Sequence, residues 1–160
     1  MQARMRMQLI AAGTRRPAWE REGFDTYARR MPRECALSLV EIAVQKRGAN
    51  ADIERLRKRE GEQMLARVAK NSLVITLDEN GRSFSTAQLA QQLRRWLASG
   101  HDLALLIGGP DGLAPACFEA ARTSWSLSPL TLPHGLARVV VAEQLYRAWT
   151  LTTGHPYHRE

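Results

Sequence analysis

The sequence predicts an α/β fold in which helices flank a mostly parallel sheet. Short apolar runs rich in branched residues alternate with longer amphipathic stretches, which is the pattern of helices that cross between parallel strands. The chain has 160 residues, a length that suits a single domain spanning residues 1–160. No internal repeat or low-complexity segment interrupts the alternation, so we expect one compact unit.

Five segments are strand candidates because they are short, apolar and rich in branched side chains. They cover residues 7–13, 37–43, 72–78, 103–109 and 125–132, the last with the weakest pattern. Residues 45–50 and a turn at residues 78–84 are the longest connections that we expect.

The first helix should begin near Pro17, since proline suits a first helical turn. Its spacing directs Trp19, Phe24 and Tyr27 toward the core, and Pro32 should stop it.

Capping residues indicate where the next three helices begin. Asn50 is the expected cap of the second helix, in which Gly61 should weaken the middle. Ser85 and Gln88 form a capping box for the third helix, and Pro115 should lie in the first turn of a short fourth helix.

The last helix, expected over residues 138–152, is apolar nearly all around. Either a partner subunit covers its second apolar face, or the helix is fully buried inside one domain. Gly154 supplies the left-handed position that ends it, and Pro156 keeps it from resuming.

The charge is unevenly distributed along the chain. The formal net charge is +7, but the first hundred residues carry +8 and the remaining sixty carry −1 together with all four histidines. The basic portion suits contact with the phosphates of a nucleic acid, although residues 54–63 could equally form a solvated helix face.

Composition also limits the cellular context. Cys35 and Cys117 lie far apart with no second thiol near either, which fits neither a disulfide framework nor a zinc site. No long apolar run or signal peptide is present. We therefore expect a cytoplasmic protein with no membrane segment.

Two irregular segments are candidates for ligand binding. The strand candidate at residues 103–109 leads into a loop with Gly108, Gly109, Pro110 and Gly112. Glycine lets a backbone approach a ligand closely, and this is the strand end where α/β sheets bind cofactors. Its spacing matches neither the dinucleotide fingerprint nor a phosphate loop, and a plain tight turn is the alternative. Residues 126–136 contain Pro129, Pro133 and Gly135, which prevent a regular strand. Backbone groups there that make no strand hydrogen bonds need other partners, and the edge of an adenine is a suitable one.

The histidines near the end of the chain do not indicate a metal site. His155 and His158 are three residues apart, but Pro156 prevents a helix and no cysteine or carboxylate cluster lies nearby. Neither a nucleophile elbow nor a pair of catalytic carboxylates is visible, which leaves common hydrolase chemistry without support.

Eight motifs together resemble the bacterial large-subunit ribosomal RNA methyltransferase H family. Members of this family are pseudouridine-N3 methyltransferases of the SPOUT superfamily. The motifs are IAAGT (10–14), KRGANADI (46–53), EGEQML (60–65), TLDENG (76–81), LLIGGPDGL (105–113), SLSPLTLPH (126–134), AEQLYRAW (142–149) and HPYHRE (155–160). The resemblance begins near Met7, so residues 1–6 look like an N-terminal extension.

The resemblance implies a single SPOUT domain with a C-terminal trefoil knot, a homodimer, and 23S ribosomal RNA within the assembled ribosome as substrate. It also implies S-adenosyl-L-methionine as cofactor. The residues that it assigns to the cofactor pocket are Leu77, Gly108, Gly109, Leu127, Ser128, Pro129, Leu130, Thr131 and Leu132.

The resemblance places residues 155–160 over the transferred methyl group, with help from the neighbouring subunit. His155 or His158 could accept the N3 proton, Arg159 could stabilise the anion that develops, and Tyr157 could stack on a base.

Three basic residues are candidates for RNA contact, namely Arg138, Lys46 and Arg47, each against the alternative of a solvated surface residue. Two other functions remain open. The chain could be a non-catalytic RNA-binding or ribosome-binding module of the same fold, or a SPOUT methyltransferase that acts on transfer RNA.

Overall fold

The computed structural model describes residues 4–159 and shows a five-stranded sheet with the order β2-β1-β4-β3-β5. Every strand pair is parallel, as predicted. The strands are β1 (Met7–Ala12), β2 (Leu37–Ile42), β3 (Ser72–Ser83), β4 (Asp102–Ile107) and β5 (Thr123–Ser126).

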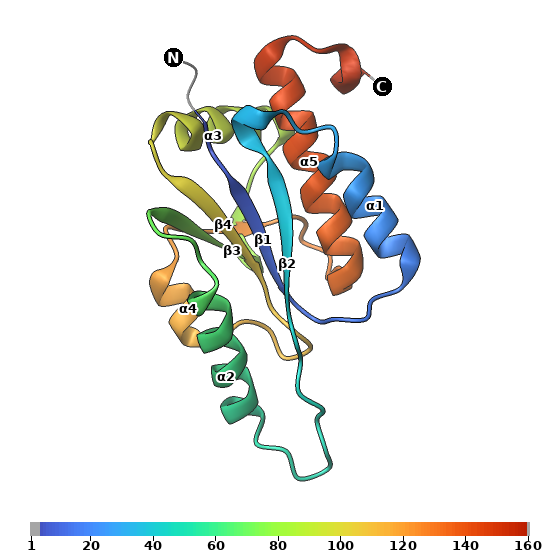
Figure 1. Cartoon of the computed structure of the whole chain (residues 1–160), viewed down its shortest axis with the longest axis vertical. Helices are drawn as coiled ribbons and strands as arrows, with labels where there is room; N and C mark the ends of the chain where they lie inside the picture. The colour runs from blue at the N-terminus through green and yellow to red at the C-terminus, as the bar shows by residue number, and fades with distance from the viewer. Residues whose placement is uncertain (1–3, 160) are drawn as a thin grey trace.

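Helices cover both faces of the sheet (Figure 1). One face carries α1 (Ala18–Ala28), α3 (Thr86–Ala98) and α5 (His134–Thr153), and the other carries α2 (Ile53–Ala66) and α4 (Pro115–Ala120). Two short 3-10 turns complete the fold, η1 (Arg33–Cys35) and η2 (Pro156–Arg159). The predicted α/β class is confirmed.

Each face of the sheet has its own hydrophobic core, which explains why the central strands are apolar at consecutive positions. In β1, Leu9 and Ala11 pack toward α1, α3 and α5, whereas Ile10 and Ala12 pack toward α2 and α4. Because side chains alternate between the faces of a strand, a sheet covered on both faces buries them all.

β3 is longer than predicted, since it continues through the expected turn at residues 78–84. The register of its pairing with β5 shifts between Leu77 and Arg82, and the end of β3 remains paired with β5. A Cβ atom at Gly81 would lie 2.7 Å from the backbone of Ser124, so close contact between the two strands requires glycine there. β5 in turn ends at Ser126, because the proline-rich segment that follows leaves the sheet.

Three details of the helices differ from the prediction. α2 begins at Ile53 and is capped by Asp52, whose carboxylate accepts a hydrogen bond from the amide of Arg55 at 3.2 Å, whereas Asn50 lies outside it. α5 begins at His134, four residues earlier than expected. Trp19 faces outward with 56% of its surface exposed.

Other expectations for the helices are confirmed. Ser85 and Gln88 form the capping box of α3, and Pro115 opens α4. Gly154 ends α5 with φ 74°. Because α5 packs between α1 and α3, helices of the same chain cover its flanks, which favours the intramolecular explanation of its apolar surface.

The first residues belong to the folded unit from Met5 onward. Residues 1–3 of the expected extension lie outside the described residues. Met5 is 1% exposed, and its amide donates to the carbonyl of Glu34 at 2.7 Å. Met5 is therefore a core residue rather than part of an appendage.

Candidate functional site

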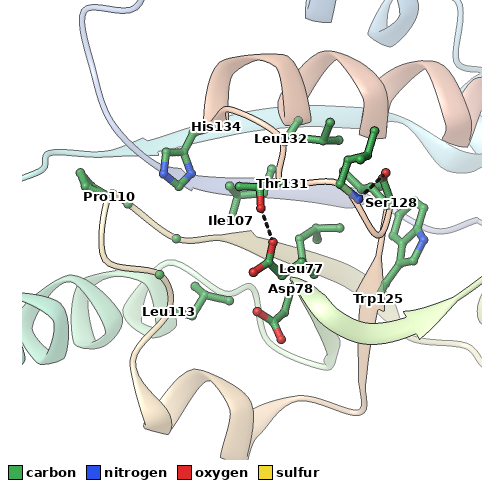
Figure 2. Close-up of a pocket in the computed structure, with 17 residues that line it drawn as sticks. Leu77, Asp78, Ile107, Pro110, Leu113, Trp125, Ser128, Thr131, Leu132 and His134 are labelled. Carbon is green, nitrogen blue, oxygen red and sulfur yellow. Dashed lines mark hydrogen bonds between the residues drawn. The ribbon is translucent and has the colours of Figure 1, made fainter.

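A cavity of about 310 Å³ lies at the carboxyl ends of β4 and β5, beside residues Leu77, Asp78 and Glu79 in the middle of β3 (Figure 2). Its walls are the loop after β4, the loop after β5 and the first turn of α5. Eight of the nine residues expected at the cofactor pocket line it, the exception being Pro129. They are Leu77, Gly108, Gly109, Leu127, Ser128, Leu130, Thr131 and Leu132.

The glycines after β4 are needed first for the shape of their own loop. A Cβ atom at Gly108 would lie 2.5 Å from the backbone of Gly112, which leaves no room for a side chain. The amide of Gly112 donates to the carbonyl of Gly109 at 3.0 Å, and Gly112 has φ 79°. From the sequence, either the approach of a ligand or a plain tight turn could account for glycine here, and the structure shows that the turn itself requires Gly108 and Gly112.

Arg47 anchors this loop. Its Nε donates to Asp111 Oδ2 at 2.9 Å, and its Nη1 and Nη2 donate to the two carboxylate oxygens of Glu60 at 2.8 and 3.1 Å. Hydrogen bonding to Glu60 and then to Asp111 raises the pKa of Arg47 despite its burial. The guanidinium is therefore committed to a network inside the protein, and this placement does not support the RNA contact that was expected.

The charged side chains that line the cavity are acidic. Asp78 and Glu79 both line it, and no lysine or arginine does so among residues 4–159. Thr131 donates a hydrogen bond to Glu79 Oε2 at 2.7 Å, which links β3 to the loop after β5, while Asp78 lies beside Leu77 (Figure 2). An acidic cavity in a protein of net charge +7 favours a cationic ligand.

Three residues at the cavity, Asp78, Glu79 and His134, were not expected there from the sequence. His134 lines the cavity from the first turn of α5. Burial lowers its pKa, and the nearby positive charges of Arg16 and Arg138 lower it further. The imidazole is therefore neutral near pH 7 and can accept or donate a hydrogen bond. The TLDENG and SLSPLTLPH motifs contain all three residues, but only the fold brings them together.

Arg138 is buried and does not face solvent. It is 2% exposed, its Nη1 pairs with Glu41 Oε2 at 2.8 Å, and its Nη2 donates to the carbonyl of Gly13 at 2.8 Å. This placement does not support the RNA contact that was expected for Arg138, because its charge ties α5 to the ends of β1 and β2. Lys46, the third candidate, is exposed between β2 and α2.

The tail packs against the second half of α5. The Tyr157 hydroxyl donates to Glu143 Oε1 at 3.0 Å, its ring centroid lies 4.7 Å from that of Tyr146, and the Arg147 guanidinium lies 5.0 Å from the Tyr157 ring. Burial raises the pKa of Tyr157, and the adjacent Glu143 carboxylate raises it further. Tyr157 therefore anchors the tail to α5, and its ring is already engaged by the protein.

The histidines of the tail differ in their surroundings. His155 is exposed, and its Nδ1 accepts a hydrogen bond from the amide of Tyr157 at 3.2 Å. His158 is half-buried, and its Nδ1 is buried with no hydrogen-bond partner in the described part of the chain. Of Arg159 the structure describes the backbone, as the last residue of η2, and not the side chain.

The tail and the cavity lie at opposite ends of α5. His134 and Ala137 in its first turns line the cavity, whereas η2 follows its last turn. A helix of 20 residues is about 30 Å long. Figure 1 shows η2 at the far end of α5 from the loops that form the cavity. The tail therefore does not close the cavity of its own chain.

Residues 4–159 lack two further kinds of site. No helix in this range is both long and apolar enough to cross a membrane. The same residues contain no group of three or more histidine, cysteine, aspartate or glutamate side chains placed to hold a metal ion.

Comparison with known proteins gives one family and several similar structures. Residues 5–158 match the family model described as "Predicted SPOUT methyltransferase". A probable methylase family protein from Haemophilus influenzae Rd KW20 is similar at 14% identity and a TM-score of 0.53, over 96% of this chain and 69% of that one. A probable rRNA-methyltransferase from Porphyromonas gingivalis is similar at 17% identity and a TM-score of 0.55, over 93% and 70%.

A third structure, the SpoU methyltransferase AviRb from Streptomyces viridochromogenes in complex with AdoMet, has 14% identity and a TM-score of 0.46, over 92% of this chain and 58% of that one. Similarity at this score carries no argument about the present chain. The first two neighbours share the fold of this chain, and at 14% and 17% identity this likeness concerns the fold alone. The family model spans nearly the whole chain, and on that match the chain belongs to the SPOUT methyltransferase family.

Proposed function

We propose that this chain is an S-adenosyl-L-methionine-dependent methyltransferase that modifies N3 of a pseudouridine in 23S ribosomal RNA on assembled ribosomes. The cofactor part rests on one observation, the acidic cavity at the carboxyl ends of β4 and β5, in a chain of a methyltransferase family. The choice of base and of RNA rests on the motif resemblance, above all on the HPYHRE ending.

The residues of the cavity fit this cofactor. S-adenosyl-L-methionine bears a sulfonium and an ammonium group, and the carboxylates of Asp78 and Glu79 supply negative charge for them. Leu77, Leu127 and Leu132 supply an apolar wall for the adenosine part. The volume of about 310 Å³ is at the lower end of the range for small-molecule sites. When bound, the cofactor supplies an electrophilic methyl group.

The protein contributes mainly alignment, exclusion of water and control of charge to an in-line displacement. The attacking N3 is an imide nitrogen, so it must lose its proton to a nearby base. The candidates for this base are the half-buried His158 and the exposed His155. Arg159 remains the candidate for stabilising the anion that develops.

The separation of tail and cavity supports a dimeric active site. Because the tail lies at the far end of α5 from the cavity of its own chain, a second copy must supply the tail that closes the cavity. Tyr157 then acts by anchoring the tail rather than by stacking on the RNA base. The proposal has three further parts. The protein is a homodimer, the two loops of the cavity form a trefoil knot, and the protein acts in the cytoplasm, where its substrate is.

Transfer of a radiolabelled methyl group to ribosomes that lack the modification tests the proposed function. We expect label in 23S ribosomal RNA, located at N3 of pseudouridine by mass spectrometry, and none in free transfer RNA. Labelled transfer RNA with unlabelled ribosomes would contradict the choice of substrate. Cofactor binding without transfer to any RNA would favour the non-catalytic module.

A complementation experiment tests the dimeric site. Deletion of residues 155–160 removes the tail, and Asp78→Arg places a positive charge in the cavity, so each variant alone should be inactive. In a mixed population half of the dimers are heterodimers, and each of these has one intact cavity facing one intact tail. We therefore expect about a quarter of the wild-type activity, on the statistics of a two-fold assembly. Absence of recovery, with both variants folded and dimeric, would contradict a shared site.

A further inference from the structure

A second cavity lies beside the tail, at the end of α5 opposite the cofactor cavity. Its volume is about 410 Å³, and its walls come from η1, the second half of α3 and the last turns of α5. Leu93 and Leu97 give it an apolar side, Trp149 gives it an aromatic side, and Arg94 and Glu34 are its charged residues. The proposed methyl transfer uses none of these residues.

The aromatic side of this cavity is part of a larger stack. The ring of Trp149 stacks on that of Tyr146, with centroids 6.1 Å apart and planes at 27°. The ring of His155 lies 6.3 Å from that of Trp149, which joins the stack to the start of the tail. Trp149 is only half-buried, so indole surface remains available at the cavity.

Arginine is frequent at the edge of the sheet where this cavity lies, and Arg94 lines the cavity itself. In a parallel α/β sheet the C-terminal ends of the crossing helices meet the N-terminal ends of the strands, and here both carry arginine. The exposed arginines at this edge are Arg4, Arg6, Arg29, Arg30, Arg33, Arg94 and Arg95. Among the described residues only Arg29 of this group forms an ion pair, with Asp25 at 3.9 Å. The edge is therefore basic, in contrast to the acidic cofactor cavity.

We propose that this second cavity binds one unpaired nucleotide of the RNA substrate, with the base stacked on Trp149 and a flanking phosphate at Arg94 or Arg33. Single-stranded RNA is bound in this way, by aromatic side chains that stack on bases and by basic groups that follow the backbone. Positive charge around the cavity suits a polyanion and disfavours an apolar peptide as occupant.

This proposal rests on the proposed function for the identity of its ligand as RNA. In a dimer whose tail reaches the cofactor cavity of the other copy, the second cavity adjoins that composite site because it adjoins the tail. The nucleotide that it holds is then a neighbour of the base to be methylated. The contact would orient the RNA without taking part in the chemistry.

Fluorescence anisotropy with a labelled single-stranded RNA of the substrate loop, together with sedimentation with unmodified ribosomes, tests the assignment. Trp149→Ala should weaken RNA binding about 5- to 150-fold, the range for loss of one stacked base. Trp149→Phe should restore most of the affinity because it keeps an aromatic surface. Arg94→Ala should weaken binding severalfold and lower the salt slope by about 0.7, the value for one phosphate contact on a single strand.

Arg59→Ala is the matched control, since Arg59 is an exposed arginine on α2, across the sheet. It should bind RNA within about twofold of wild type if the contact at Arg94 is specific rather than general attraction. All variants should retain wild-type affinity for S-adenosyl-L-methionine in calorimetry, which shows that they are folded with an intact first cavity.

Two results would overturn the assignment. If wild type binds RNA while Trp149→Ala and Arg94→Ala bind equally well, the second cavity is not a nucleotide site, and the proposed function stands. If wild type binds neither RNA nor ribosomes although it binds the cofactor, both the nucleotide site and the choice of substrate are wrong.

Discussion

Arg47→Ala should destabilise the protein strongly, because Arg47 neutralises a carboxylate that has almost no access to water. The Glu60 side chain is 5% exposed, and both of its oxygens accept hydrogen bonds from Arg47. Removing one partner of a buried pair costs about 3–5 kcal/mol, since an unpaired charge remains. A domain has a total stability of about 5–15 kcal/mol, so this loss is a large part of it.

Neighbouring changes should have smaller effects that identify the cause. Asp111 is 31% exposed, so Asp111→Asn should cost only about 0–1 kcal/mol while it frees the loop after β4 and weakens cofactor binding. Arg29→Ala breaks an exposed pair at 3.9 Å and should cost less than about 0.5 kcal/mol. Adding Glu60→Gln to Arg47→Ala should recover part of the loss, because the buried charge is then gone.

Urea denaturation at pH 7, followed by tryptophan fluorescence, measures these differences. In thermal denaturation, the melting temperature of Arg47→Ala should lie about 6–20 °C below that of wild type, because each kcal/mol shifts it by about 2–4 °C in a domain of this size. A cost below about 1 kcal/mol, or a double variant no more stable than Arg47→Ala, would refute the argument from an unpaired buried carboxylate.

Three other substitutions test the cofactor cavity and the packing. Asp78→Asn should weaken binding of S-adenosyl-L-methionine about tenfold in calorimetry, as a loss of about 1.4 kcal/mol of charge attraction predicts. Binding of the thioether product, which lacks the sulfonium charge but keeps the ammonium group, should weaken less, and equal losses would contradict a role for Asp78 beside the sulfonium. Burial and then the charge of Arg16 lower the pKa of His134 from 6.5. As the pH drops below about 6.5, His134 is protonated in the unfolded state before it is protonated in the folded state, so the stability of the protein should fall. His134→Gln should remove that part of the loss in thermal melts between pH 5 and 8, and an unchanged pH profile would exclude it. Gly61→Ala should destabilise the protein by about 1–3 kcal/mol despite its better helix propensity, because the new Cβ would lie 2.6 Å from that of Ala114. A variant that is more stable than wild type in urea would show that α4 shifts at little cost.

Local chemistry explains why much of the lining of the proposed cofactor cavity could be predicted. The glycines after β4 and the prolines after β5 exclude regular structure over a few residues, so both loops were visible in the sequence. Eight of the nine expected residues line the cavity. Asp78 and Glu79 were missed because Asp-Glu-Asn-Gly is typical of a turn, whereas pairing with β5 extends the strand through it.

The predicted RNA contacts show the opposite case. Arg47 and Arg138 resemble surface residues in the sequence, because a basic residue gives no sign of a carboxylate that will meet it. Their partners are Glu60 and Glu41, the latter 97 residues away along the chain. Only the folded chain brings these charges together and removes them from the surface that RNA could reach.

By itself the sequence determined what depends on neighbours in the chain: the alternation of strands and helices, the caps at Ser85 and Gly154, and the two irregular loops. The tertiary structure decided what depends on distant segments, namely the acidic lining of one cavity, the basic edge around the other, and the length of α5 between cavity and tail. Backbone preferences act over a few residues, whereas burial and charge pairing arise only when remote parts of the chain meet.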